Sequence, residues 1–166
     1  MSLFRITAVV LLLGLPTACG FQPLYGSATQ NAEVKQELAD IYIPPIKGRT
    51  GQILRNQLLD VITPKGFPEA PKYRLLITFE VQKIGLAIQE NDTKTRFNLT
   101  MNTRFRLTDP TEKAVVYAGS TQTVSAYNVV QSEFANLAAE NNAEKRAAIV
   151  AAEQINQQLS VFFSAK

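Results

Sequence analysis

The sequence predicts an α+β fold: a two-layer sandwich in which a four-stranded, mostly antiparallel sheet has two helices packed on one face. Apolar periodicity along the chain gives the order strand, helix, three strands, helix. Between Arg96 and Leu107, nearly every second residue is apolar and the residues between them are polar. This alternation is typical of an antiparallel strand with one buried and one wet face.

The composition limits both the number of domains and the possible chemistry. The chain has 166 residues, of which 46% are hydrophobic and 19% charged, as expected for one domain with a core of its own. It contains no histidine and one cysteine, which excludes a Ser-His-Asp triad, a histidine-based metal site and imidazole acid–base catalysis. We therefore expect no metal and no cofactor.

Residues 1–18 resemble a secretory signal peptide. Arg5 is the only charge, Ile6 to Leu15 is almost entirely apolar, and small residues follow Pro16. The apolar run is too short to cross a bilayer, which needs about 20 apolar residues.

Cys19, the only cysteine, lies where this signal would be cleaved. One interpretation is a chance cysteine beside a signal peptidase site. The other is a bacterial lipoprotein in which Cys19 is acylated, palmitate being a typical chain, and becomes the new N-terminus. Each buried CH₂ group of an acyl chain contributes about 0.8 kcal/mol, so several chains would anchor the protein permanently. Because Gly20 replaces the aspartate that often retains lipoproteins at the inner membrane, we expect the periplasmic side of the outer membrane.

The first part of the mature chain is expected to be a polar tether over residues 19–32, followed by a single α+β domain over residues 33–166. A short strand at Ile41–Ile43 is stopped by Pro44 and Pro45. A helix follows Gly48, with Thr50 as its N-cap, and ends near Ile62.

The second part carries the remaining strands and the last helix. Strands are expected over residues 73–82, 96–107 and 115–126, followed by a helix from about Ser132, its possible cap, to Phe163. Polar residues 140–142 could interrupt this helix. Its expected apolar stripe comprises Phe134, Leu137, Ala148, Ala152, Ile155, Leu159 and Phe162.

Three arginines are the candidate binding residues. Arg96, Arg104 and Arg106 alternate with amides and hydroxyls on one face of the expected strand. Guanidinium groups bind phosphates and carboxylates, so this face is a candidate anion site. The alternative is an ordinary solvated sheet face whose charges prevent edge pairing. The net charge of +3 is small and no nucleic-acid-binding motif is present, so we expect no nucleic-acid partner.

A carboxylate enzyme is a further alternative. Glu80, Glu90 and Asp92 could form an acid group for glycoside chemistry, but nothing in the sequence fixes their spacing. We therefore expect no enzymatic activity.

The run Cys19-Gly20-Phe21-Gln22-Pro23-Leu24-Tyr25-Gly26 resembles the mature start of the lipopolysaccharide-assembly lipoprotein family LptE, alphaproteobacterial type. The order of elements and the length are similar to that family too. The resemblance implies a non-enzymatic lipoprotein that plugs the outer-membrane β-barrel LptD, helps it assemble, and binds lipopolysaccharide on its way to the outer leaflet. It assigns one residue, Cys19, as the lipid attachment site. The alternative is an auxiliary lipid-binding lipoprotein of an ABC-type envelope lipid-trafficking system.

Overall fold

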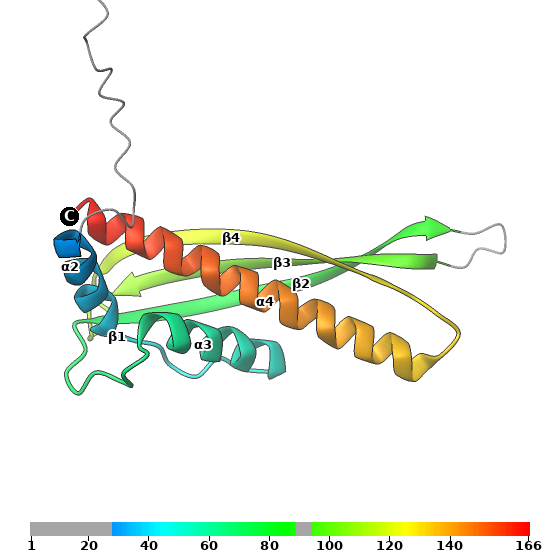
Figure 1. Cartoon of the computed structure of the whole chain (residues 1–166), viewed down its shortest axis with the longest axis horizontal. Coiled ribbons are helices and arrows are strands. Elements are labelled where there is room, and N and C mark those ends of the chain that lie inside the picture. The colour runs from blue at the N-terminus through cyan, green and yellow to red at the C-terminus, as the bar shows by residue number, and fades with distance from the viewer. Residues whose placement is uncertain (1–27, 89–93) are drawn as a thin grey trace, which may run out of the picture.

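The described helices lie on one side of a single sheet (Figure 1). The structure is a computed structural model that describes residues 28–88 and 94–166, with side chains described for 32–85 and 96–166. In chain order the elements are α2 (Ala28–Ala39), β1 (Ile41–Tyr42), α3 (Arg49–Ile62), β2 (Tyr73–Ile88), β3 (Lys94–Thr108), β4 (Val115–Asn128) and α4 (Glu133–Ser164).

The sheet has the strand order β1-β2-β3-β4. β1 pairs with β2 in parallel over only two residue pairs, whereas β2–β3 and β3–β4 are long antiparallel ladders. The expected α+β sandwich with a four-stranded sheet is confirmed, and the sheet is mixed rather than wholly antiparallel. Pro44 and Pro45 directly follow the short first strand, as expected, because proline has no N–H for the ladder.

The alternation in β3 predicts its buried face correctly. Leu99, Met101, Phe105 and Leu107 are at most 1% exposed and form the centre of the core. They pack under α4, whose side chains facing the sheet are mostly alanines. The buried alanines are Ala143, Ala147, Ala148, Ala151 and Ala152.

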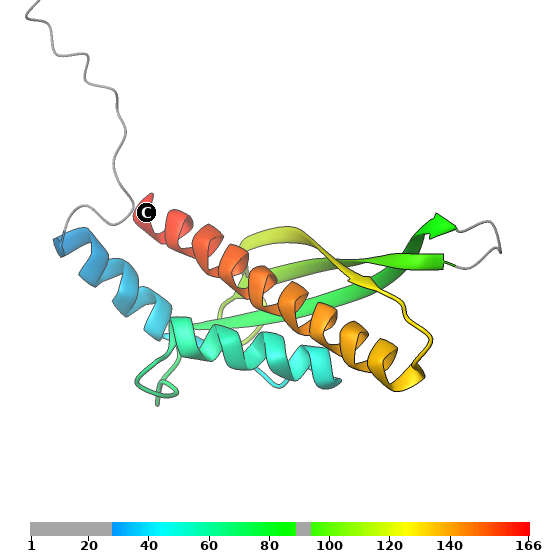
Figure 2. The same cartoon turned by 45° about the vertical axis from the view of Figure 1, so that its right-hand side comes forward.

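The helix α2 was not expected from the sequence. It begins at Ala28, inside the stretch predicted as tether, and so crosses the expected boundary with the domain at residue 33. Glu37 ties it to the body, accepting a hydrogen bond from the Tyr73 hydroxyl at 2.9 Å and lying 3.5 Å from Lys72. Figure 2 shows α2 beside the C-terminal end of α4, with α3 and α4 side by side. The rest of the predicted tether, residues 19–27, lies outside the described residues.

The helix ends differ in part from the sequence expectation. Gly48, with φ +82°, is the N-cap of α3, and Thr50 lies inside the helix with its hydroxyl bonded elsewhere. The predicted cap of α4 is confirmed, because the Ser132 hydroxyl accepts from the Ala135 N–H at 3.4 Å. α4 runs without interruption through residues 140–142.

The expected apolar stripe of α4 is wrong at its start. Phe134 and Leu137 are 83% and 59% exposed, because this end of the helix extends past the packed core. The remaining stripe residues are buried or half-buried. Among the described helices, none is long and apolar enough to cross a membrane.

Candidate functional site

The outer face of the sheet, opposite the helices, holds an open groove of about 830 Å³. Its floor crosses β2, β3 and β4 at the level of Arg104 and Arg106, and the segment Pro44–Ile46 forms one wall. Both arginines come from β3, an inner strand of the sheet, where the two-residue period places them on the same face.

Arg104 and Arg106 lie about 7 Å apart along the strand, as expected for positions two residues apart. Thr78 and Ser120 pair with Arg104 on its two sides, so hydroxyl groups flank this guanidinium. Leu76 and Ala118 occupy the same positions beside Arg106. Both arginines are exposed, and neither forms an ion pair within the part of the chain that the structure describes.

Arg96 does not belong to this groove. It pairs with Ala87 and Asn128 near the far end of the hairpin, eight residues before Arg104. Eight residues of strand span roughly 27 Å. The structure therefore brings two of the three predicted arginines together and leaves the third at a separate place on the same strand.

A ladder of polar side chains continues the outer face beyond Arg104. Gln122 donates from Nε2 to Oδ1 of Asn102 at 2.8 Å, and Gln82 donates to Glu80 at 3.4 Å. These amides offer both donors and acceptors, which suits the hydroxyl groups of sugars. The alternation of amides along β3 is evident in the sequence, whereas the bond across strands from Gln122 to Asn102 is not.

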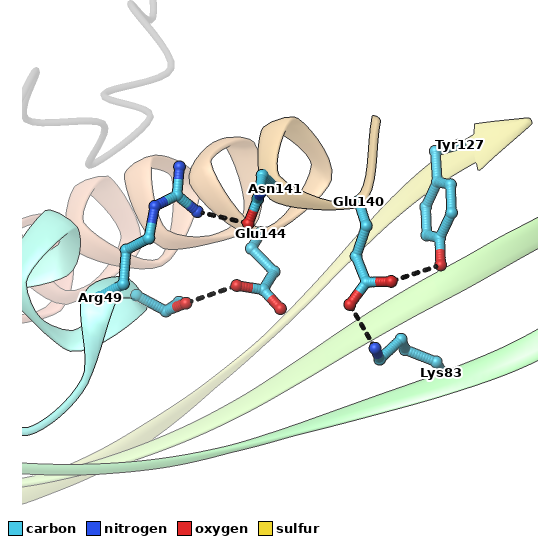
Figure 3. A network of polar contacts seen from close by, with 7 residues as sticks. Arg49, Lys83, Tyr127, Glu140, Asn141 and Glu144 are labelled. Atoms are coloured by element: carbon cyan, nitrogen blue, oxygen red, sulfur yellow. Dashed lines mark hydrogen bonds and ion pairs between the residues drawn. The ribbon is translucent and has the colours of Figure 1, made fainter. Parts of the chain in front are cut away.

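The other side of the sheet contains a polar network that was not predicted from the sequence (Figure 3). Glu140 of α4 accepts hydrogen bonds from Lys83 of β2 and from the Tyr127 hydroxyl of β4. One turn later, Glu144 accepts from the Thr50 hydroxyl of α3 at 2.7 Å. The signal was the i, i+4 spacing of the two glutamates, which places both on one helix face.

The network raises the pKa values of two of its groups. The hydrogen bond to Glu140 raises the pKa of the Lys83 ammonium group above its ordinary value. Burial, together with the negative charge of Glu140, raises the pKa of the Tyr127 hydroxyl. Both groups are held in the protonated form that the carboxylate binds, so this network is a structural connection between helices and sheet.

The carboxylates considered for catalysis do not form a described site. Glu80 lies on the outer face of β2, whereas Glu90 and Asp92 lie outside the described residues. Within residues 28–88 and 94–166, no group of three or more acidic or cysteine side chains is placed to hold a metal ion. Cys19, the predicted lipid attachment site, also lies outside the described residues.

Solved structures with this fold include three bacterial lipoproteins. A putative lipoprotein from Caulobacter crescentus is 27% identical, with a TM-score of 0.67 over 81% of this chain and 98% of that one. The rare lipoprotein B from Shewanella oneidensis is 14% identical, with a TM-score of 0.56, covering 74% of this chain and 92% of that one. A minor lipoprotein from Acinetobacter baumannii is 17% identical, with a TM-score of 0.56, covering 73% and 88%. No curated protein sequence matches the chain.

The fold defines a small α+β protein with the architecture of these lipoproteins. The family model described as LptE, lipopolysaccharide-assembly, matches residues 38–159, a range that includes every described strand, α3 and most of α4. The chain therefore belongs to the LptE family of lipopolysaccharide-assembly lipoproteins.

Proposed function

We propose that this protein is an outer-membrane lipoprotein, anchored on the periplasmic side through Cys19, that plugs the LptD β-barrel, helps it assemble, and binds lipopolysaccharide. Family membership supports the pathway. The observation that carries the binding part is the Arg104–Arg106 pair on the floor of an open groove.

Lipopolysaccharide fits this groove chemically. Its lipid A and core sugars carry phosphate groups, and guanidinium groups bind phosphates through charge-assisted hydrogen bonds. Such a bond contributes about 1.5–3 kcal/mol when well formed. Thr78, Ser120 and the amide ladder supply uncharged partners for the neighbouring sugar hydroxyls.

The outer face also supports the role of a plug. The lumen of a large outer-membrane barrel is polar, so a protein inside it needs a surface that forms hydrogen bonds. The outer face of β3 provides this with Asn98, Thr100 and Asn102 between the arginines. Neither plugging a barrel nor binding lipopolysaccharide needs a catalytic group, and we propose no enzymatic activity.

The test is purification of the tagged protein from detergent-solubilised outer membranes. We expect it to bring down a large β-barrel in equal amount, and depletion of the protein to reduce lipopolysaccharide at the cell surface. Recovery as a free monomer, together with unchanged surface lipopolysaccharide after depletion, would contradict the proposal. Equal competition for the groove by simple phospholipids would instead favour the lipid-trafficking alternative.

A further inference from the structure

The two long edges of the sheet differ in how their backbone groups are satisfied. On β4, two side chains of α4 donate to backbone carbonyls: Gln158 to the Ser120 oxygen at 3.1 Å and Arg146 to the Ala126 oxygen at 2.9 Å. Such coverage protects an edge strand from pairing with another chain. The β4 edge is thus partly closed by its own helix.

The edge of β2 has no such protection. β1 pairs only with Tyr73 and Arg74, and Pro44 and Pro45 then end that strand. From Thr78 to Gly85, a segment we name the β2 edge, β3 is the only hydrogen-bonded neighbour among the described residues. No described side chain bonds to its backbone. Every second residue of the β2 edge therefore presents an N–H and a C=O to solvent.

This edge is also regular. Its register with β3 is unbroken from Arg74 to Gly85, and the first irregularity follows Gly85. Natural edge strands usually carry a bulge, a proline or an inward-pointing free charge. The one inward-pointing charge here, Lys83, is already paired with Glu140.

The buried face of β2 is incompletely covered. Phe79 and Val81 are only partly buried, whereas their partners on β3, Thr103 and Met101, are fully buried. α3 does not close this gap, because it packs mainly against α4 rather than against the strands (Figure 2). A strand added beside β2 would cover Phe79 and Val81.

We propose that the β2 edge binds an extended strand from a different polypeptide by β-augmentation. The incoming strand has apolar side chains at alternate positions, facing Phe79 and Val81. Its polar side carries a lysine or arginine beside Glu80, which is exposed and forms no ion pair within the described residues. The β2 edge shares Thr78 with the arginine groove, but the proposed contact is with the backbone of the edge and not with the arginines, so the inference does not depend on lipopolysaccharide binding.

The test uses the full protein in detergent and the capped peptide Thr-Val-Thr-Val-Lys-Val-Thr-Val as the probe. We expect amide exchange between Thr78 and Gly85 to slow about tenfold at saturating peptide, while β4 amides remain unchanged. A peptide with alternate N-methylated residues should not bind, because it cannot complete the backbone ladder.

The variant E80K should weaken binding of the lysine peptide about fivefold and favour the peptide with glutamate in its place. E153K is the matched control, since it makes the same charge change at an exposed position on α4. Protection on β4 instead, equal binding of the N-methylated peptide, or equal effects of E80K and E153K would overturn the proposal. So would a dimer in sedimentation that E80K dissociates, because a second copy would then occupy the edge.

Discussion

Arg104 and Arg106 differ from Arg74 on the neighbouring strand in having no carboxylate partner within the described residues. Arg74 is held 2.9 Å from Glu112, which occupies its charge. The two groove arginines keep their full donor capacity on an open surface. An external anion can therefore bind them without first breaking an internal ion pair.

We expect the double substitution R104A/R106A to weaken lipopolysaccharide binding at least about tenfold, because it removes two charge-assisted hydrogen bonds. Titration of the detergent-purified protein with lipopolysaccharide measures the affinity. The unfolding midpoint should remain unchanged, since both side chains are exposed. R96A is the control, roughly 27 Å away along the strand. Equal losses of affinity in R96A and in the double variant would show that this face is an ordinary solvated surface without a specific site.

We expect C19S to abolish lipid attachment and release the protein from the membrane, because serine provides no thiol for the thioether bond. Mass spectrometry of the native protein and membrane fractionation measure this outcome. An unmodified N-terminus with residues 1–18 still present on the native protein would disprove the predicted anchor.

For single residues, the sequence could predict which face of the strand the arginines share but not their neighbours in space. The two-residue period placed all three arginines on one face, which is correct. The two-residue period does not show where along the strand a groove forms, so the sequence could not separate Arg96 from the two groove arginines. The groove depends on the wall Pro44–Ile46, which lies about 60 residues before the arginines, and such long-range proximity has no periodic signal.

The contact between α4 and β4 depends on small residues on both elements. Gly119 lies under the Phe105 ring, and a Cβ at this position would be 2.5 Å from Cζ of Phe105 and 2.6 Å from Oε1 of Gln158. Nearby, the Thr123 hydroxyl donates to the Ala147 carbonyl oxygen at 3.2 Å. Helix and strand are therefore packed without space for one additional methyl group.

We expect G119A to lower the free energy of unfolding by about 1–3 kcal/mol, because the added methyl group overpacks the site. Urea denaturation measures this change. S120A, on the exposed face one residue later, should stay within about 0.5 kcal/mol of the wild type. F105L should reduce the cost of G119A in a double-mutant cycle, and additive effects would contradict the steric explanation.

The elements themselves were predictable where their pattern is long. β3, β4 and the last helix appear within two residues of their predicted bounds, because each repeats its period several times. β2 begins where expected but continues to Ile88, six residues past its predicted end at residue 82. α2 carries one clear apolar pair, Val34 and Leu38, which is too short to distinguish a helix from a polar linker. Its position is determined by Lys72 and Tyr73, which contact it from another part of the chain.

The molecule as a whole is elongated, with α4 extending along most of the sheet (Figure 1). The network around Glu140 and Glu144 connects α3, α4 and the sheet. Its two titrating donors, Lys83 and Tyr127, have raised pKa values in the folded protein. The connection is therefore complete at neutral pH and sensitive to alkali.

We expect the free energy of unfolding to be constant near neutral pH and to fall as the pH rises above about 10, the ordinary pKa of both groups. A group whose pKa is raised on folding stabilises the protein below its unfolded pKa, and this stability is lost through its folded pKa. Urea denaturation at several pH values from about 8 to about 11 measures how the free energy of unfolding changes with pH. E140Q should flatten this slope, whereas an unchanged slope in E140Q would show that other groups cause the loss.

The row of alanines along α4 also affects the width of the molecule. A helix of 32 residues is about 48 Å long whatever its side chains are, but its separation from the strand beneath depends on the size of the residues in between. Alanine and glycine keep that separation small, so the body stays slender over its whole length. Replacing Ala147 or Ala151 with leucine would widen the cross-section of the protein without changing its length. A channel that enclosed the protein would then have less space for it.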